Sequence, residues 1–165
     1  SGNIYGPRDF NLDRIVPHVI TRLIKNKPPI IRSNGKLKRD YIYVEDVANA
    51  YEKLMNKMIK SNKKLYVYNI GSNTNLQNLD ISKKLISIAK KKIKIKKNVK
   101  IKFVKDRPGH DLRYALNSEK IKKTLKWKPK IKINAGLTKT FMWYFNNKKY
   151  YSNISKKDIT KRLGN

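Results

Sequence analysis

The chain has 165 residues, of which 39% are hydrophobic, and this is enough apolar material for one folded domain with a buried core. It contains no cysteine and only two histidines, which excludes a disulfide framework, a thiolate nucleophile and the common zinc clusters. No apolar run reaches the roughly 20 residues that a membrane-spanning helix needs. We therefore expect a cytoplasmic protein with no metal site and no membrane partner.

The formal net charge of +30 points toward polyanions such as nucleic acid. The cations are mostly lysine and are scattered over predicted helix faces and loops, as in residues 90–92 and 94–97. Proteins that bind nucleic acid usually gather their cations on one face, interleave aromatic residues and use arginine to hold phosphate. We expect nonspecific binding at low salt and no specific nucleic-acid partner, with a basic nucleic-acid-binding domain as the alternative function.

The first part of the chain is predicted to contain two helices and two extended segments. Apolar residues recur at helical spacing over residues 15–24, and the pair Pro28-Pro29 ends this pattern. Residues 29–32 are predicted to be extended, with a turn at residues 33–35. Residues 39–44 alternate as in a strand and lead into a helix. The apolar stripe of that helix consists of Val44, Val47, Ala48, Tyr51, Leu54, Met55 and Met58.

The middle of the chain is predicted to contain a strand and a helix. Residues 65–70 are rich in tyrosine, valine and isoleucine, which is typical of a buried strand, and residues 71–73 form a turn after it. A helix then begins near Asn78, whose side chain is predicted to cap it. This helix turns Ile81, Leu85, Ile88 and Ala89 toward the core.

The last part of the chain is predicted to alternate short strands and helices. Residues 100–104 are extended, residues 106–111 form a loop, residues 114–116 form a short strand, and residues 135–147 form a last helix. Asn117 and Ser118 cap a short helix that ends at Leu125. Alternating helices and strands indicate an α/β or α+β unit over residues 1–147, followed by a polar tail over residues 148–165. The opening segment, residues 1–7, is typical of the end of a strand, so we expect truncation at the amino end.

Three short motifs carry chemical information. They are GNIYGP at residues 2–7, RDYIYVED at residues 39–46, and DRPGHD at residues 106–111 followed by RYA at residues 113–115. Arg39 precedes an apolar strand and Arg107 lies on a loop restricted by proline and glycine, so both have rigid supports. A guanidinium group binds a diphosphate through paired hydrogen bonds in a partly dry cleft. On the residues alone, an ordinary surface arginine explains either position equally well.

In order and spacing over residues 3–143, these motifs resemble the carboxy-terminal half of extended short-chain dehydrogenases, most closely the nucleotide-sugar 4,6-dehydratases. The RDxxYVxD pattern marks only the superfamily, whereas DRPGHDxRYA is similar to the dTDP-glucose 4,6-dehydratases. The resemblance implies an α/β fold that is the substrate-binding part of a Rossmann-type protein, with the amino-terminal Rossmann half missing. It also implies the nucleotide-sugar-binding portion of an NAD-dependent lyase, which oxidises the sugar at C4, eliminates water and reduces C6.

The resemblance further implies which residues bind the substrate. Asn3 would contact the sugar or phosphate, Asn78 the phosphates, and Ile4 the cofactor. Arg14 and Ile15 would lie on the helix that covers the nucleotide. The whole predicted substrate set is Asn3, Arg14, Ile15, Ile30, Ile31, Arg32, Arg39, Asn78, Asp106, Arg107, Pro108, Gly109 and His110.

A purely structural explanation exists for several of these residues. Asn78 can be a helix cap, the isoleucines can be core residues, and His110 can be a loop histidine. Asp40, Tyr43 and Asp46 are predicted to be structural and to fix the turn from strand to helix.

Two positions depart from the pattern of the dTDP-specific enzymes, which have asparagine in place of Ile4 and an aromatic residue in place of Arg32. Residues 1–12 and 29–35 instead resemble the CDP-glucose 4,6-dehydratases. The nucleotide base is therefore left open, and a fragment of a CDP-glucose 4,6-dehydratase or a nucleotide-sugar epimerase is a further alternative.

The family's catalytic chemistry requires parts that this sequence does not contain. NAD is held by a glycine-rich turn at a helix start, and no G-x-x-G-x-x-G occurs here. Catalysis also needs a Tyr-x-x-x-Lys pair and an acidic pair. Tyr144 and Lys148 have that spacing, but they fall on the last helix, where the family has a packing surface. We therefore predict no catalytic residue.

The chain alone is predicted to be inactive, with the missing Rossmann half as its partner and a homodimer in the full-length form. A noncatalytic remnant is the other alternative. The central prediction is geometric: Arg39 and Arg107 converge on one cleft, together with Asn3, Asn78 and His110.

Overall fold

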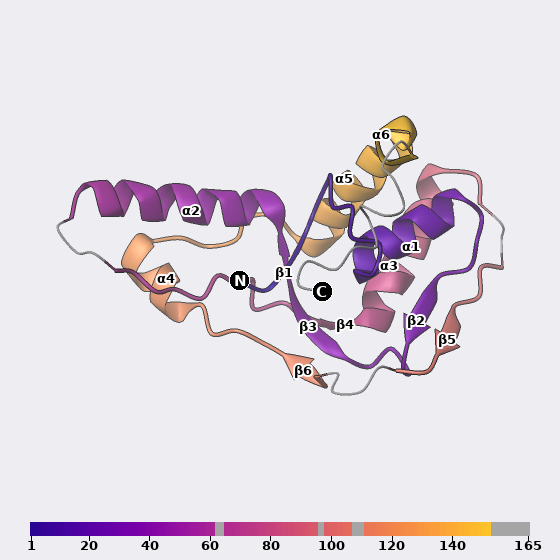
Figure 1. Cartoon of the computed structure of the whole chain (residues 1–165), viewed down its shortest axis with the longest axis horizontal. Coiled ribbons are helices and arrows are strands. Elements are labelled where there is room, and N and C mark those ends of the chain that lie inside the picture. Colours follow the sequence, from indigo (N-terminus) through magenta and orange to yellow (C-terminus); the bar gives the residue numbers. More distant parts are fainter. Residues whose placement is uncertain (62–64, 96–97, 107–110, 153–165) are drawn as a thin grey trace, which may run out of the picture.

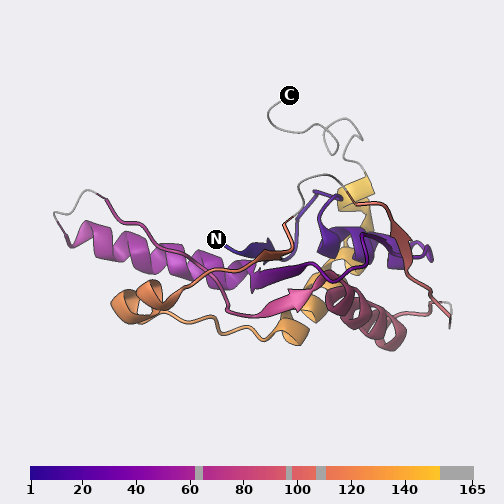
Figure 2. The ribbon, with the colours of Figure 1, turned by 90° about the horizontal axis from the view of Figure 1, so that it is seen from below.

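A computed structural model describes residues 1–61, 65–95, 98–106 and 111–152. Figure 1 shows an elongated molecule in which three helices gather at one end: α1 (Ile15–Ile24), α3 (Asn78–Lys92) and α5 (Ile133–Asn146). Helix α2 (Val44–Ile59) extends toward the other end, with α4 (Glu119–Leu125) beside it in both views (Figures 1 and 2). The short α6 (Lys148–Ser152) follows α5. None of the helices in the described ranges is long and apolar enough to cross a membrane.

The strands form two small sheets. The first contains β1 (Asn3–Tyr5), β3 (Lys38–Tyr43), β4 (Asn75–Gln77) and β6 (Arg113–Tyr114), with β3 in the middle. Strands β1 and β6 pair with β3 in parallel, and β4 pairs with it in antiparallel orientation. The second sheet joins β2 (Ile30–Arg32) to β5 (Lys102–Val104) in parallel. Because β3 is paired on both edges, it is a rigid support for the RDYIYVED motif.

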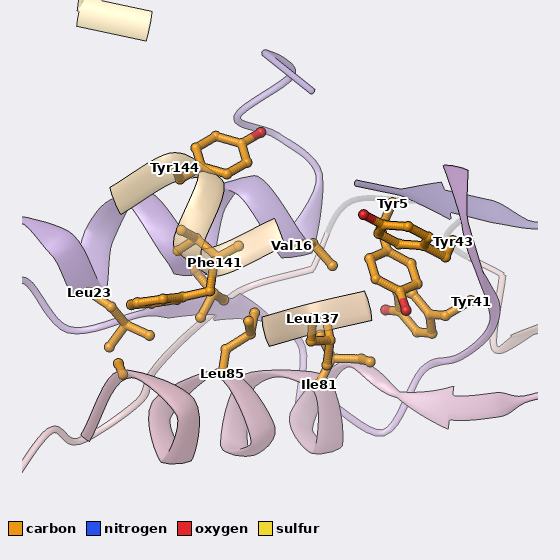
Figure 3. Close-up of a cluster of buried hydrophobic side chains, with 13 residues drawn as sticks. Tyr5, Val16, Leu23, Tyr41, Tyr43, Ile81, Leu85, Leu137, Phe141 and Tyr144 are labelled. Carbon is orange, nitrogen blue, oxygen red and sulfur yellow. The ribbon is translucent and has the colours of Figure 1, made fainter. Parts of the chain in front are cut away.

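A large hydrophobic cluster fills the space between α1, α3, α5 and the tyrosines of the first sheet (Figure 3). We call it the first cluster, and its buried members are Tyr5, Val16, Val19, Ile20, Leu23, Tyr41, Tyr43, Ile81, Leu85, Ala89, Leu137, Phe141 and Tyr144. A smaller second cluster consists of Ile42, Val47, Ala50, Ile70, Ile121 and Trp127. The predicted inward face of α3 is confirmed by the burial of Ile81, Leu85 and Ala89.

The prediction of a buried strand at residues 65–70 is wrong. The segment belongs to no strand, and the side chains of Leu65 and Val67 are exposed. The alternation typical of a strand is nevertheless present, since Tyr68 and Ile70 pack with the second cluster. A backbone hydrogen bond joins the segment to the residue before β1, from the Gly2 N–H to the Ile70 carbonyl at 2.8 Å. A strand also needs a ladder of hydrogen bonds, and no described strand pairs with this segment.

The apolar stripe predicted for α2 does not form a core face. Val44, Tyr51, Met55 and Met58 are exposed, and Val47 is the member of the stripe that is buried. The helix buries a different face, made of Asp46, Val47 and Ala50. Helical periodicity shows which residues share a face, but it does not show whether another part of the molecule covers that face.

Helix α3 begins at Asn78 as predicted, but the predicted cap is wrong. The N–H of Gln77 donates to Asp80 Oδ2 at 3.2 Å, while the side chain of Asn78 reaches across to strand β3. Three other boundaries also differ from the predictions. The strand predicted at 114–116 is Arg113–Tyr114, the last long helix is Ile133–Asn146, and the predicted tail begins with α6.

Candidate functional site

A cavity of about 730 Å³ brings most of the predicted site residues together. Its lining includes Asn3, Ile4, Arg14, Ile15, Ile30, Ile31, Arg32, Arg39 and Asn78. These residues come from β1, the start of α1, β2, β3 and the start of α3. Asp106 is described but does not line the cavity, and Arg107, Pro108, Gly109 and His110 lie outside the described residues. The predicted convergence of Arg39 and Arg107 can therefore be followed only for Arg39.

Arg39 supplies an unbalanced positive charge to this cavity. Its backbone is held on both edges, beside Leu76 of β4 and Tyr114 of β6, and the residue is only 9% exposed. Its Nη1 donates to the Lys38 carbonyl at 2.8 Å, and none of the described carboxylates forms an ion pair with it. A buried charge without a partner destabilises the folded state by about several kcal/mol, because the charge has lost its hydration. An anionic ligand would supply the missing charge.

The start of α3 adds a second favourable element for an anion. Asn78 is the first residue of this 15-residue helix, where the helix dipole gives a partial positive charge. Its backbone N–H is already used, since it donates to the Leu37 carbonyl at 3.1 Å. Its side-chain Oδ1 accepts a hydrogen bond from the Tyr41 hydroxyl at 2.7 Å. The side-chain N–H groups of Asn78 are the donors that this helix start can offer to the cavity.

Arg14 differs from Arg39 because its charge is balanced within the chain. Its Nη1 lies 3.0 Å from Asp9 Oδ2, and its Nη2 donates to the Ile4 carbonyl. The same Asp9 accepts a hydrogen bond at its carbonyl from the Tyr144 hydroxyl. Arg14 thus ties the loop before α1 to strand β1, and it shapes the cavity wall.

The cavity extends from Arg39 to strand β2, where Ile31 is buried and Arg32 is exposed. His18 of α1 also lines the cavity, and the sequence analysis assigned it no role. Burial and the nearby Arg22 lower the pKa of His18, so its imidazole is neutral at pH 7. Its Nε2 is buried without a hydrogen-bond partner. The signal that was missed is its spacing of four residues from Arg14, which places both residues on one side of α1.

Tyr41 is the second lining residue without a predicted role. It lies two residues after Arg39 on β3, and residues two apart on a strand point to the same side. This spacing was the signal available in the sequence. The remaining unpredicted lining residues are Ser1, Gly2, Tyr5, Asp9, Leu12, Asp13, Val16, Pro17, Val104, Asp111 and Tyr114.

Two acidic residues of the RDYIYVED motif, Asp40 and Asp46, accept hydrogen bonds from distant loops. Asp40 is fully buried and accepts hydrogen bonds from the N–H and hydroxyl of Ser72, at 3.1 and 2.7 Å. Asp46 accepts from the N–H groups of Lys130 and Ile131, at 2.8 and 3.0 Å. These contacts fix one loop against β3 and another against α2, and the predicted role of these residues in the turn from strand to helix stays a prediction.

Tyr144 is a packing residue, in agreement with the prediction. It is buried in the first cluster, and its hydroxyl is used by the Asp9 carbonyl. Within the described ranges, no group of three or more His, Asp or Glu side chains is arranged to hold a metal ion. Three arginines and three aspartates line the cavity, and one pair of them, Arg14 and Asp9, forms an ion pair.

The chain is similar to known enzymes that act on nucleotide sugars. The family model described as GDP-mannose 4,6 dehydratase matches residues 1–140. A dTDP-glucose 4,6-dehydratase of Escherichia coli is 37% identical over 158 residues, which cover 92% of this chain and 42% of that protein. The solved structure of a Bacillus anthracis dTDP-glucose 4,6-dehydratase in complex with NAD has a TM-score of 0.79 and 29% identity, covering 92% of this chain and 44% of that one. A Thermotoga maritima UDP-glucose 4-epimerase with UDP-glucose has a TM-score of 0.75 and 26% identity, covering 88% and 44%.

The chain spans less than half the length of each of these proteins. The structural matches confirm the predicted α/β fold of Rossmann type, and the partial coverage is consistent with the predicted partial chain. The family match extends over all of the residues that line the cavity and over all three motifs. The chain therefore belongs to the nucleotide-sugar 4,6-dehydratase-like extended short-chain dehydrogenases.

Proposed function

We propose that this chain is the nucleotide-sugar-binding part of an NAD-dependent lyase of the dTDP-glucose 4,6-dehydratase type. The observation that carries the proposal is the buried Arg39, which lines the cavity and has no carboxylate partner among the described residues. A sugar nucleotide carries a diphosphate that would balance this charge through hydrogen bonds strengthened by the charge of both partners. Asn78, at the positive end of α3, lies on the same cavity and would contribute further donors.

The loop at residues 107–110 is part of the same proposal. Asp111, which follows this segment in the sequence, lines the cavity, and so does Tyr114. This position supports a role for Arg107 as the second cation of the diphosphate site and for His110 beside it. Asp106 would then act through the loop, because it does not itself line the cavity.

The base is proposed to lie at the end formed by β2, where Ile30, Ile31 and Arg32 line the cavity. The matched relative from Escherichia coli is a dTDP-glucose enzyme, which supports a thymine nucleotide. Arg32 and Ile4 are the positions at which the chain departs from that type, and they keep a CDP-sugar as the alternative. A direct comparison of the two nucleotides is therefore part of the test.

NAD and the catalytic residues are proposed to belong to the amino-terminal half that relatives of full length possess. The sequence contains no glycine-rich turn of the kind that holds the pyrophosphate of NAD, and Ile4 on β1 is the cavity residue that we place beside the cofactor. The exposed apolar residues of α2 and of the 65–67 segment support the need for a covering partner. A homodimer of the complete protein and a cytoplasmic location belong to the same proposal, and cell fractionation tests the location.

Calorimetric titration tests the binding proposal. The 165-residue chain is titrated at physiological salt with dTDP-glucose, CDP-glucose, UDP-glucose and duplex DNA. We expect binding of a sugar nucleotide that Arg39→Ala weakens by roughly 10- to 100-fold, the value of a charge-assisted hydrogen bond. Lys83→Ala is the control, because it removes one positive charge from an exposed position of α3 outside the cavity.

Three outcomes would contradict the proposal. They are an equal effect of both substitutions, no effect of Arg39→Ala, and binding of DNA without binding of any sugar nucleotide. The absence of activity is tested separately by incubating the same chain with NAD and each sugar nucleotide. We expect no 4-keto-6-deoxy sugar, and its formation would contradict the assignment of catalysis to another half.

A further inference from the structure

Strand β3 separates its side chains into two sets with different surroundings. Arg39 and Tyr41 line the cavity, whereas Asp40 binds Ser72 and Ile42 belongs to the second cluster. This separation follows from the alternation of side chains along a strand. Of the two residues that face the cavity, Arg39 has a role in the proposed function and Tyr41 has none so far.

The position of Tyr41 is fixed by its surroundings. It is only 3% exposed, and its backbone is in register with Asn3 of β1. Its carbonyl oxygen lies 2.7 Å from the Ser72 hydroxyl oxygen, whose single proton it shares with Asp40 Oδ1. Its ring packs edge-on against the ring of Tyr5, with 6.5 Å between the ring centroids. The hydroxyl of Tyr41 therefore has a defined place in the cavity wall.

The hydrogen bond from Tyr41 to Asn78 engages the oxygen end of the Asn78 amide. The Tyr41 hydroxyl donates to Oδ1 at 2.7 Å, so the acceptor end of the amide is occupied. The other end of the amide, Nδ2, carries two N–H groups, which can donate hydrogen bonds but cannot accept them. If the amide turned over, Oδ1 would face the diphosphate instead, and two groups of partly negative oxygens would repel each other.

The hydroxyl of Tyr41 keeps its proton throughout the physiological range. Burial raises the pKa of Tyr41 well above its ordinary value, and the opposite effect of Arg39 and Arg14 is smaller. A tyrosine that stays protonated remains a donor. The proton that Tyr41 donates to Asn78 Oδ1 is therefore present at every pH at which the cavity would bind its ligand.

We propose that Tyr41 is a positioning residue, which holds the Asn78 amide with its N–H groups toward the diphosphate beside Arg39. This inference rests on the proposed function, since it names how a second donor is prepared for the same ligand. The energetic effect comes from preorganisation: the amide does not have to be turned and fixed when the ligand binds. Tyr41 itself need not touch the ligand.

A double-mutant cycle tests this indirect role. The probe is the sugar nucleotide that the wild-type chain binds most tightly, and its affinity is measured by calorimetry for Tyr41→Phe, Asn78→Ala and the double variant. Tyr41→Phe removes only the hydroxyl, and we expect a loss of roughly fivefold, the value of one neutral hydrogen bond. Asn78→Ala should lose roughly tenfold. In the double variant, the loss should equal that of Asn78→Ala alone, because the hydroxyl then has nothing to position.

Tyr43→Phe is the matched control. Tyr43 is also buried on β3, but it does not line this cavity, and its hydroxyl contacts Glu45 at 3.5 Å. We expect its affinity to stay within twofold of the wild-type value. A general effect of losing a buried hydroxyl would instead weaken binding in both tyrosine variants, and it would add to the effect of Asn78→Ala.

A second measurement does not depend on ligand affinity. In the free protein, Tyr41→Phe should shift the NMR signals of the Asn78 side-chain NH₂ group, and Tyr43→Phe should leave them in place. Additive losses in the cycle, or unchanged Asn78 signals, would overturn the role of Tyr41. Binding that is insensitive to Tyr41→Phe overturns this inference and leaves the proposed function intact, whereas a wild-type chain that binds no sugar nucleotide overturns both.

Discussion

The two hydrophobic clusters differ in how completely the described chain encloses them. The first cluster is surrounded by α1, α3, α5 and the first sheet, and further half-buried side chains such as Ile88 and Trp143 pack against it. The second cluster lies between α2, α4 and the 65–70 segment, and large apolar residues around it stay in solvent. Met55, Ile59 and Leu65 are 55%, 74% and 69% exposed. The first region is an enclosed core, whereas the second region has large apolar side chains exposed to solvent.

This difference shows which part of the site is self-supporting. The cavity-lining residues of β3, Arg39 and Tyr41, lie on the side of the first cluster, while Ile42 of the same strand belongs to the second. A binding cavity can therefore form on the enclosed core even though the neighbouring region is thinly packed. Exposed apolar surface next to such a core is typical of a contact with another protein part.

The largest effect is expected from a cavity in the first cluster. Phe141 is fully buried between α1, α3 and α5 (Figure 3), and Phe141→Ala should lower the free energy of unfolding by about 3–5 kcal/mol. Met58→Ala removes a side chain from the exposed face of α2 and should change it by less than about 0.5 kcal/mol. Urea denaturation measures both. Similar losses in the two variants would show that α2 is as well packed as α5 and would remove the contrast between the regions.

A cavity in the second cluster should have a smaller and more local effect. Ile121 of α4 is fully buried there, and Ile121→Ala should cost about 2–3 kcal/mol. In hydrogen exchange, the amides of α4 and those near Ile70 should lose protection, while those around Leu85 in α3 keep theirs. If protection falls equally in α3, the two clusters unfold as one unit, and the division drawn above does not hold.

The buried carboxylate of Asp46 joins the second region to the first. Asp46 of α2 accepts hydrogen bonds from the N–H groups of Lys130 and Ile131, just before α5, and it is 5% exposed. Asp46→Asn replaces one acceptor oxygen by a donor that faces an N–H group, which should cost about 1–2 kcal/mol in urea denaturation. Glu45→Gln is the control, because Glu45 is exposed and its ion pair with Lys139 spans 3.6 Å. It should cost less than about 0.5 kcal/mol, and equal costs would show that the link is not specific to Asp46.

The parts that could be predicted from the sequence are those that local patterns determine. Helix α1 has the predicted bounds, and the strand before α2 was expected within one residue, because spacing and proline positions specify such elements. The nine site residues that meet in the cavity were expected from family motifs, which carry information about tertiary structure that periodicity lacks.

The missed parts depend on contacts between distant segments. Residues 65–70 have the composition of a strand, yet whether they form one depends on a neighbour to pair with. The stripe of α2 has helical spacing, yet its burial depends on what lies opposite. Tyr41 reaches Asn78 over 37 positions of sequence, a contact that neither residue type nor spacing shows.

The smallest predicted effect is the change that His18, in the first region, makes to the free energy of unfolding as the pH falls. Burial and Arg22 lower the pKa of His18, with smaller opposing effects from Leu12 and Asp13 and a further lowering by Arg32 across the cavity. The unfolded chain therefore binds a proton near the usual histidine pKa of about 6.5, while the folded chain does not. Stability rises with pH wherever the unfolded state binds more protons, so this histidine should lower the free energy of unfolding as the pH falls through that value.

His18→Gln isolates this contribution, because glutamine keeps a polar side chain but does not titrate. In urea denaturation at pH 7.5 and 5.5, the wild type should lose more stability on acidification than the variant, and at pH 7.5 protonation of His18 should contribute nothing to the difference between them. A wild type that loses less stability than the variant would mean that the folded state protonates His18 more readily than the unfolded chain does. That result would mean that Asp13 and the Leu12 carbonyl outweigh burial, Arg22 and Arg32 at the imidazole, and the lowered pKa of His18 would be wrong.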